Sequence, residues 1–358
     1  MKSYFLLLYH WFRIDVFNIP GRMIAFIFII AISLIPLIAR EPHVLRILII
    51  AAIFAIYAAS WDFLAGYTGQ ISFGHSLFFG GAAYVAALLN IHLKLPPWVT
   101  IPAGGIASVI LGLVAGIPAL RLRGFYLALV TLSFPAILTG IIFVFPDFTG
   151  GELGLFGIQR LSSSRVLDNY IVFVIMLISI LVMYKLTDIG SKIVRVGVVF
   201  QAIREDEITA RRSGINTVRY KLLSFAISGF FAGIAGGLYA HFLKIVGPST
   251  LELFFAFQPV LWTIFGGIGT IYGAVVGVYI LYPVMEVVRL HPMGDQIRGV
   301  FIALILILTL LFMPEGVSVW VRDKIEVKCQ RCKIINISIR RHCRACHAPL
   351  HLEKNGTI

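Results

Sequence analysis

Long apolar runs separated by short polar stretches dominate this 358-residue chain. Runs of roughly twenty residues are long enough to cross a hydrocarbon layer about 30 Å thick as helices. The apolar segments fall near 22–39, 44–61, 72–90, 98–120, 124–146, 168–186, 221–246, 253–290 and 298–313. They are continuous rather than alternating, which excludes a transmembrane β-barrel. The pattern predicts an all-α, polytopic membrane protein embedded in the lipid bilayer.

The composition agrees with this class and explains the charge. Hydrophobic residues make up 59% of the chain and charged residues only 13%, whereas a soluble domain carries about a quarter charged residues. The formal net charge is +13, and regions 1–22, 121–124, 185–221 and 314–358 hold 22 of the 30 Lys and Arg residues. Basic loops mark the cytoplasmic side of membrane proteins. Topology therefore accounts for the basic balance, and nucleic acid is not needed as a partner.

These basic regions also fix the number of crossings, because an even number of spans must separate loops on one side. Four runs precede the basic turn at 121–124, and two more precede the polar loop at 187–220. Three simple spans after that loop would put the basic C-terminus on the opposite side. Splitting the run 253–290 near Gly266–Gly273 restores parity. We therefore predict about ten crossings of the cytoplasmic membrane, with both termini cytoplasmic.

Two glycine-rich stretches interrupt the apolar runs with similar patterns, FGHSLFFGGAAYV and FGGIGTIYGAVVG. Paired glycine interruptions in two halves of a chain are typical of internally duplicated transporters with discontinuous helices. Small residues also let helices approach closely in lipid, so a single glycine fits either interpretation. Together, the two stretches predict two broken or re-entrant helices and an internal pseudo-repeat.

Polar side chains near these breaks are functional candidates, because polarity inside a membrane is costly. The predicted translocation-path residues are Gln70, Ser72, His75, Gly266, Gly267 and Gly269. His75 either bonds a carbonyl that the break frees or contacts substrate or a gate. Gln70 and Ser72 either satisfy unwound backbone or line the path. Asp62 falls near the inner end of its span, where we expect an interfacial ion pair with an arginine of RLRG (121–124).

The polar loop at 187–220 contains the pattern of a short surface helix. An acidic run (205–207) precedes two arginines, which complements the helix macrodipole. Glu207 and Arg211 are four apart in the favourable order, and Gly214 follows as a helix stop. A permease needs such a rigid cytoplasmic helix to receive force from an ATPase subunit. The candidate coupling residues are Arg204, Glu205, Asp206, Glu207, Arg211 and Gly214.

Six motifs occur in order along the chain: GYTGQISFGHSLFFGGAAY, RLRGFYLALVTL, TGGELGL, QAIREDEITARRSGINTVRYKLLSF, FGGIGTIYGAVVG and LFMPEG. Together they resemble, from about residue 44 to 316, the membrane-spanning permease subunit of the branched-chain amino acid ABC transporter family (the LivM type, related to LivH). The resemblance implies that Arg204–Gly214 is the EAA-like coupling segment that docks into the nucleotide-binding subunit. The loop DEITARRSG departs from the stricter EAA pattern of other ABC importers.

The same resemblance implies an ATP-driven importer that works by alternating access. Its partners would be a LivH-type permease, two ABC ATPase subunits and an extracytoplasmic substrate-binding protein. Branched-chain amino acids are the expected substrates, while urea, short amides and other amino acids use closely related permeases.

The chain itself is not expected to be an enzyme. It contains no G-x-x-x-x-G-K-[ST] phosphate loop, so ATP would enter only through the partner subunit. A stand-alone channel or ion-coupled carrier would need no coupling helix and would carry charged pairs in mid-span. A zinc-dependent membrane anchor would leave the six motifs unexplained. The expected organisation is an interfacial segment 1–21, a permease domain 22–316 with its coupling loop 187–220, and a cytoplasmic tail 317–358.

All four cysteines lie in the tail, as CQRC (329–332) and CRAC (343–346). Two C-x-x-C pairs at this separation fit a tetrahedral structural zinc site. The predicted ligands are Cys329, Cys332, Cys343 and Cys346. His342 and His347 flank the second pair as alternative ligands, and 329–350 resembles a short zinc ribbon. Free thiols or two disulfides are the other interpretations, and a reducing cytoplasm disfavours disulfides.

Overall fold

The computed structural model describes residues 41–120, 122, 124–162, 164–188, 196–289, 294–332, 335–338, 342–343, 346 and 348–350. The expected interfacial segment 1–21, the first apolar run 22–39 and the two arginines of RLRG lie outside these residues. Arg40–Gly316 forms one compact unit, and the tail from Val317 belongs to another. The first unit is called the bundle below.

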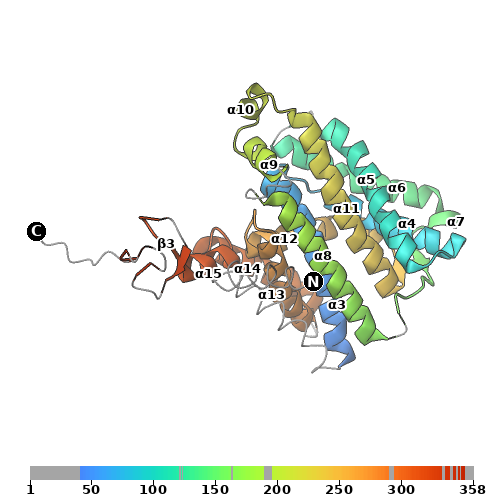
Figure 1. Ribbon diagram of the computed structural model, residues 1–358. Coiled ribbons are helices and arrows are strands. Elements are labelled where there is room, and N and C mark those ends of the chain that lie inside the picture. Colours follow the sequence, from blue (N-terminus) through green and yellow to red (C-terminus); the bar gives the residue numbers. More distant parts are fainter. Residues whose placement is uncertain are drawn as a thin grey trace, which may run out of the picture. The chain divides into compact units, whose positions relative to one another are not determined.

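The bundle is built almost entirely of helices (Figure 1). In chain order they are α3 (Pro42–Thr68), α4 (His75–Leu93), α5 (Pro97–Ala119), α6 (Phe125–Val144), α7 (Pro146–Thr149), α8 (Arg165–Thr187), α9 (Val196–Glu205), α10 (Glu207–Arg212), α11 (Thr217–Leu243), the 3₁₀ helix η2 (Pro248–Leu251), α12 (Leu253–Gly266), α13 (Ile271–Arg289) and α14 (Gly294–Phe312). Within the described part of the chain, eight helices are long and apolar enough to cross a membrane. The predicted all-α polytopic class is confirmed.

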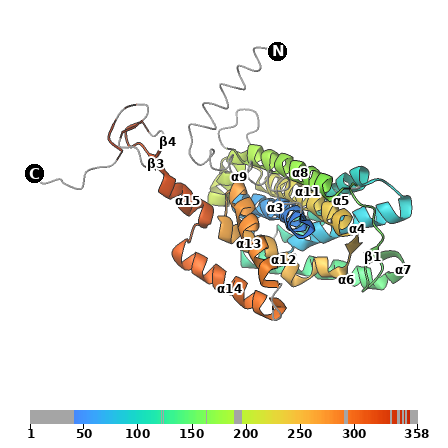
Figure 2. The same cartoon turned by 90° about the horizontal axis from the view of Figure 1, so that it is seen from below.

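Helix α3 forms the centre of the bundle. Of its 27 residues, 21 are buried, which is the pattern of a helix that is apolar all round because protein surrounds it. It packs against α8, α11, α12 and α13, and Figure 2, seen nearly along α3, shows these helices around it. The groups that α3 carries are therefore shielded from lipid, and its end is positioned by several neighbours at once.

Helices α4, α5 and α11 pack closely because small residues face one another. The Ser108 hydroxyl donates to the Phe78 carbonyl at 2.6 Å, across the α4–α5 contact. A Cβ added at Gly233 would lie 2.9 Å from the Cα of Gly105, across the α5–α11 contact. Backbone approach of this kind is how helices associate in lipid, where there is no hydrophobic driving force between them.

A helix boundary lies beside each glycine-rich stretch, but the first stretch is itself mostly helical, since α4 runs unbroken from His75 to Leu93. Helix α3 ends at Thr68 and α4 begins at His75. The second break falls between Gly266, the last residue of α12, and Ile271, the first residue of α13. Helix α12 has 14 residues, which is short for a membrane span. The split that charge parity requires in 253–290 is therefore confirmed.

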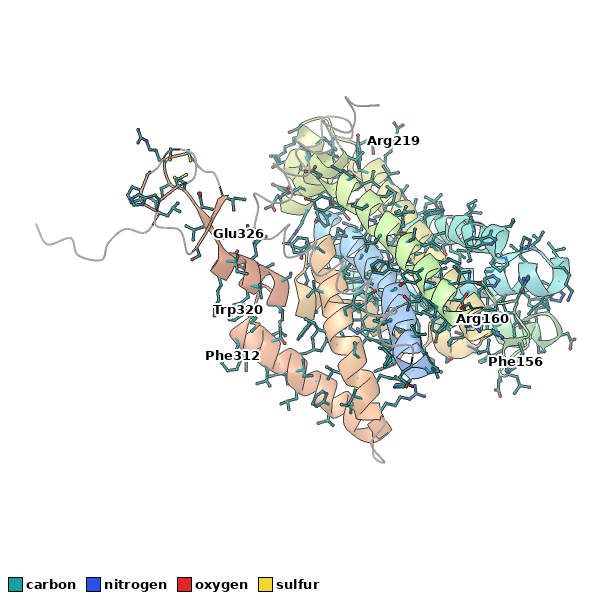
Figure 3. All side chains as sticks on the ribbon, turned by 60° about the horizontal axis from the view of Figure 1, so that its bottom comes forward. Phe156, Arg160, Arg219, Phe312, Trp320 and Glu326 are labelled. Carbon is teal, nitrogen blue, oxygen red and sulfur yellow. The ribbon has the colours of Figure 1, made fainter. Side chains whose placement is uncertain are left out.

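A small two-stranded sheet lies at one end of the bundle. Strand β1 (Leu155–Phe156) pairs antiparallel with β2 (Ile245–Val246), and Leu155 lies opposite Val246. In Figure 3, Phe156 and Arg160 lie at this end, whereas Arg219, near the start of α11, lies at the other. The polar loop with α9 and α10 and the turn after α7 are therefore at opposite ends of the bundle.

Side chains from four helices hold the loop after β1. The Asn90 Oδ1 of α4 accepts the Gln159 amide at 2.8 Å. The Gln159 carbonyl lies 2.6 Å from Nδ1 of His241, at the end of α11, and the other ring nitrogen of His241 bonds Thr100 of α5 at 2.6 Å. The next residue, Arg160, pairs with the buried Asp168 of α8 at 2.7 Å. Bonds to several helices at once therefore hold this loop in place.

The tail is a small unit of its own. It consists of α15 (Val317–Ile325), β3 (Glu326–Lys328) and β4 (Ile335–Ile337). The two strands pair antiparallel, with Val327 opposite Asn336. The described residues of the tail include few large buried side chains, so this unit needs another source of stability.

We predict that Gly236→Ala destabilises the protein, because the added Cβ would collide with the Phe79 carbonyl across the α4–α11 contact. Overpacking of this kind costs about 1–3 kcal/mol. The measurement is the melting temperature in detergent. Gly140→Ala is the matched control, since its Cβ would meet nothing within 4 Å. Equal melting temperatures for the two variants would contradict the packing account.

Candidate functional site

The first break is a glycine-terminated helix end. Gly69 has φ 69°, a left-handed conformation that glycine adopts without steric cost. Its amide donates to Ala65 O at 3.1 Å, and the Gln70 amide donates to Leu64 O at 3.4 Å. The Gly69 bond is the single 5→1 bond of the αL motif, which satisfies a carbonyl at the end of a helix. Helix α3 therefore stops by local geometry.

Polar side chains satisfy the backbone that this break exposes. The indole N–H of Trp61 donates to the Ser72 carbonyl at 2.7 Å. The Phe73 amide donates to the Thr131 hydroxyl of α6 at 3.1 Å, and the Gly74 amide to the Ser72 hydroxyl at 3.3 Å. In this conformation Ser72 holds the break in shape.

His75 is fully buried at the start of α4 and bonds a hydroxyl rather than a freed carbonyl. Its Nε2 lies 2.9 Å from the Ser60 Oγ. The Ser60 hydroxyl donates to the Tyr57 carbonyl at 2.7 Å, so its oxygen accepts the hydrogen bond from Nε2–H, and the Nε2–H tautomer follows. The imidazole also stacks on the Tyr57 ring. His75 thus joins α4 to α3.

The second break is also glycine-based and comes close to α13. Gly267 has φ 123°, and its carbonyl accepts the Thr270 hydroxyl at 2.7 Å. A Cβ on Gly266 would collide with the Gly273 backbone and lie 3.1 Å from the Gly277 amide nitrogen. Helices α12 and α13 therefore meet at backbone distance, which larger side chains would prevent.

The two breaks meet at Asp62. Its Oδ1 accepts the Gly269 amide at 2.7 Å, and a Cβ on Gly66 would lie 2.7 Å from that same amide nitrogen. Asp62 is 0% exposed, and the arginines of RLRG with which we expect it to pair lie outside the described residues. Helix α3 extends to Thr68, beyond the end of the apolar run, so Asp62 lies inside the bundle.

The polar loop contains the predicted short helix, α10, and a second helix, α9, before it. Asp206 separates them and caps α10, since its Oδ1 accepts the Ile208 amide at 2.8 Å. Gly214 has φ 85° just after α10. Glu205 is exposed at the end of α9.

Two coupling candidates bond groups of the bundle, although Arg204 is also exposed to solvent. Glu207 bonds the buried Lys221 of α11 at 2.8 Å and Arg211 at 3.1 Å. The Arg204 guanidinium donates to the carbonyl of Gly66, in the last turn of α3. The loop is thus tied to α11 at one point and to the first break at another.

A family described as "Branched-chain amino acid transport system / permease component" matches residues 43–310, which contain both breaks and the polar loop. The chain belongs to this family. Its bundle is accordingly that of a multi-pass membrane permease component.

Individual relatives of the permease agree. It is 28% identical over 305 residues to the high-affinity branched-chain amino acid transport system permease protein LivM of Salmonella typhimurium, covering 78% of this chain and 71% of the relative. It is 24% identical over 288 residues to LivH of Escherichia coli K12, covering 74% and 90%. BraD of Pseudomonas aeruginosa is 30% identical over 164 residues, covering 46% and 52%. No solved structure matches the chain.

A cavity of about 190 Å³ in the permease lies beside the polar loop. Gln70, Arg204, Glu207 and Lys221 are among the residues that line it. The Gln70 amide nitrogen donates to Thr68 O at 3.2 Å, while its Oε1 has no partner among the described residues. Of the path candidates in the first break, Gln70 lines this cavity, whereas Ser72 and His75 are engaged in holding the helices together.

The tail, which lies beyond the family match, brings its four cysteines together. Their sulfurs all lie within 4.8 Å of one another. The Cys329 and Cys346 sulfurs are 3.5 Å apart, and the Cys332 and Cys343 sulfurs 3.4 Å apart. A tetrahedral zinc with Zn–S bonds of about 2.3 Å separates its sulfurs by about 3.8 Å. Four thiols in this arrangement fit a metal ion, whereas disulfides need sulfurs about 2.05 Å apart.

The surroundings of the cysteine cluster fit the same interpretation. The Asn336 amide nitrogen lies 3.5 Å from the Cys343 sulfur, the kind of outer contact that orients metal ligands. The Cys343 amide donates to Ala348 O at 2.8 Å, which fixes the second C-x-x-C turn. His342 is exposed, and His347 lies outside the described residues. The geometry favours the four thiols as the ligand set.

We predict that Asp206→Ala loosens α10. Bonds from the Thr209 hydroxyl and from the Thr209 and Ile208 amides hold the pKa of the Asp206 carboxyl below its ordinary value. The cap is therefore fully present above the ordinary carboxyl pKa and is lost as pH falls through the lowered pKa. The readout is faster hydrogen exchange of the amides of residues 207–212 in the alanine variant.

Asp206→Asn is the matched control, because asparagine caps helices as well as aspartate does. It should keep the protection of α10 and remove its pH dependence. Equal exchange in the alanine variant and the unmodified protein would refute the cap.

Proposed function

We propose that this chain is the LivM-type permease subunit of an ATP-driven ABC importer of the cytoplasmic membrane. The observation that carries the proposal is the α9–α10 pair at one end of the bundle, bonded to the first break through Arg204 and to α11 through Glu207. A stand-alone channel or carrier has no use for this element. The family match and the relatives of both LivM and LivH type support the assignment.

The partners follow from this role. A LivH-type permease would complete the transmembrane part, two ABC ATPase subunits would dock on α10, and an extracytoplasmic protein would deliver substrate to the end where the β1–β2 sheet lies. The basic polar loop and the basic tail would then face the cytoplasm, in line with the bias of cytoplasmic loops towards Lys and Arg. ATP-driven movement of α9 and α10 would alternate access to a path that includes Gln70 and the two breaks.

Branched-chain amino acids are the proposed substrates, because the relatives' names specify them. The external protein binds substrate before the permease does, so its ligand preference distinguishes amino acids from urea or short amides. Binding of urea, and not of leucine, isoleucine or valine, would replace the substrate while leaving the importer intact.

We predict that the chain co-purifies with an ATPase subunit in mild detergent and that Glu207→Ala with Arg211→Ala weakens this association. The double substitution removes the 2.8 Å bond that holds α10 to Lys221. Loss of a partly buried charged pair costs about 1.5–3 kcal/mol, or about tenfold or more in affinity if the docking surface is displaced. The measurement is the amount of ATPase subunit retained on the tagged permease.

Glu286→Ala with Arg289→Ala is the matched control. This pair, 3.7 Å apart, ends α13, which runs 19 residues away from the second break. Its loss should leave ATPase retention unchanged. Absence of any ATPase subunit, or uptake that continues without ATP, would overturn the importer proposal.

We also propose that the tail holds one structural zinc through Cys329, Cys332, Cys343 and Cys346. Zinc would replace the core that so small a unit lacks. The clustering of the four sulfurs within 4.8 Å supports this ligand set.

Elemental analysis of the purified protein should therefore give about one zinc per chain, by the four-ligand count. Cys343→Ser should lower this content, because the loss of one of four thiolates opens the site. His342→Ala should leave it unchanged. Full zinc in the serine variant would refute the site, and zinc loss in the alanine variant would refute the four-thiolate set.

A further inference from the structure

Arg204 bonds a backbone carbonyl at the end of α3 that the neighbouring amide of the chain does not bond. Gly66 lies in the last turn of α3, where carbonyls have no partner within the helix. The Gln70 amide, which would continue the helix by bonding Gly66 O, bonds Leu64 O instead. The Arg204 guanidinium, from the last turn of α9, donates to the Gly66 carbonyl. A cation at this position also complements the negative end of the helix macrodipole.

The same side chain lies against the second break. A Cβ added at Gly269 would be 2.9 Å from the Arg204 Nη1, so the guanidinium touches the turn between α12 and α13. A Cβ added at Gly69 would be 3.7 Å from the Arg204 Cγ. Asp62 binds the Gly269 amide to α3 from the other side. One arginine thus contacts both breaks, at the point where they are bonded to each other.

Helix α9, which carries Arg204, is packed firmly against α3. Phe200 is fully buried and meets the Phe63 ring edge-on, with 5.6 Å between centroids. Ile203 is buried as well. Beyond Arg204 the chain leaves the helix at Asp206 and begins α10. Movement of α10 therefore reaches the bundle by two routes, through the Glu207–Lys221 bond to α11 and through α9, which an aromatic pair and one guanidinium anchor to α3.

We propose that Arg204 is the positioning residue that transmits movement of the polar loop to both broken helices at once. Its guanidinium holds the end of α3, and the Asp62–Gly269 bond makes the α12–α13 turn follow. This rests on the proposed importer function and deepens it. The ATPase would still dock on α10 without Arg204, but its movement would no longer displace the two breaks together.

The test uses the complete complex with its partner permease, ATPase subunits and binding protein in proteoliposomes. The measured quantity is substrate taken up per ATP hydrolysed, for the unmodified protein, Arg204→Gln, Arg204→Lys and Arg219→Gln. Loss of a hydrogen bond to a charged group should lower this ratio about tenfold in Arg204→Gln. ATP hydrolysis and ATPase retention are measured in the same samples, so that the ratio separates coupling from docking.

The two other variants separate positioning from general damage. Lysine keeps a positive charge near the Gly66 carbonyl but lacks the planar fork, so Arg204→Lys should recover part of the ratio. Arg219 is an exposed arginine near the start of α11 whose side chain has no hydrogen bond among the described residues. Arg219→Gln should behave like the unmodified protein. An unchanged ratio in Arg204→Gln, or a drop as large in Arg219→Gln, overturns the proposal.

A distance measurement gives a readout that misfolding alone would not produce. Spin labels carried by unnatural amino acids at Gln201 of α9 and at Ile268, in the turn, are both at exposed positions and spare the tail cysteines. The distance between the two labels should stay the same when nucleotide binds to the unmodified complex. In Arg204→Gln, the distribution of this distance should become broader when nucleotide binds. A separation that already changes with nucleotide in the unmodified complex shows that the two elements move independently, which refutes the proposal.

The results that would refute the importer function differ from those that would refute the role of Arg204. If no ATPase subunit binds the unmodified chain, the proposed function fails. If the complex assembles and transports with the Arg204→Gln substitution as it does without it, only the role of Arg204 fails.

Discussion

A helix that stops inside a packed bundle leaves carbonyls and amides without partners in the helix, and the structure depends on how these groups are bonded. Lipid offers them nothing, so each must find a partner within the protein. At the first break, Trp61 and Thr131 bond the loop backbone directly. At the second, the Gly269 amide finds the carboxylate of Asp62. The breaks are therefore joined to neighbouring helices by the bonds that make them possible.

This bonding also explains why the polar loop packs where it does. The Gly66 carbonyl is most easily satisfied by a donor that reaches it from the end of the helix, and α9 supplies one in Arg204. The buried Phe200 ring holds α9 in place for that contact. On the far side of Asp206, the Glu207 carboxylate joins α10 to α11. A surface loop is thereby bonded to the least regular part of the interior.

The sequence predicts the local features of this structure but not its long-range contacts. Span lengths, the break between Gly266 and Ile271 and the cysteine cluster follow from rules of segment length, charge side and ligand spacing, which are local or additive. The Asp62–Gly269 bond joins residues 207 positions apart, and no local pattern pairs a carboxylate with a particular amide. The apolar run ends near Asp62, yet α3 continues to Thr68. Tertiary contacts on all sides extend the helix beyond its apolar segment.

The loop after β1 is held by bonds to several helices, so the two ends of the bundle differ in how easily they bend. Asn90, His241 and Arg160 bond that loop or anchor it to separate helices, so bending there would break several hydrogen bonds together. At the opposite end, a single capping residue, Asp206, separates two short helices. One end of the bundle is therefore held by several bonds between helices, whereas the other end contains a short joint between α9 and α10. A displacement of α9 and α10 would therefore be accommodated by the helices between the two ends, because the loop after β1 is held in place.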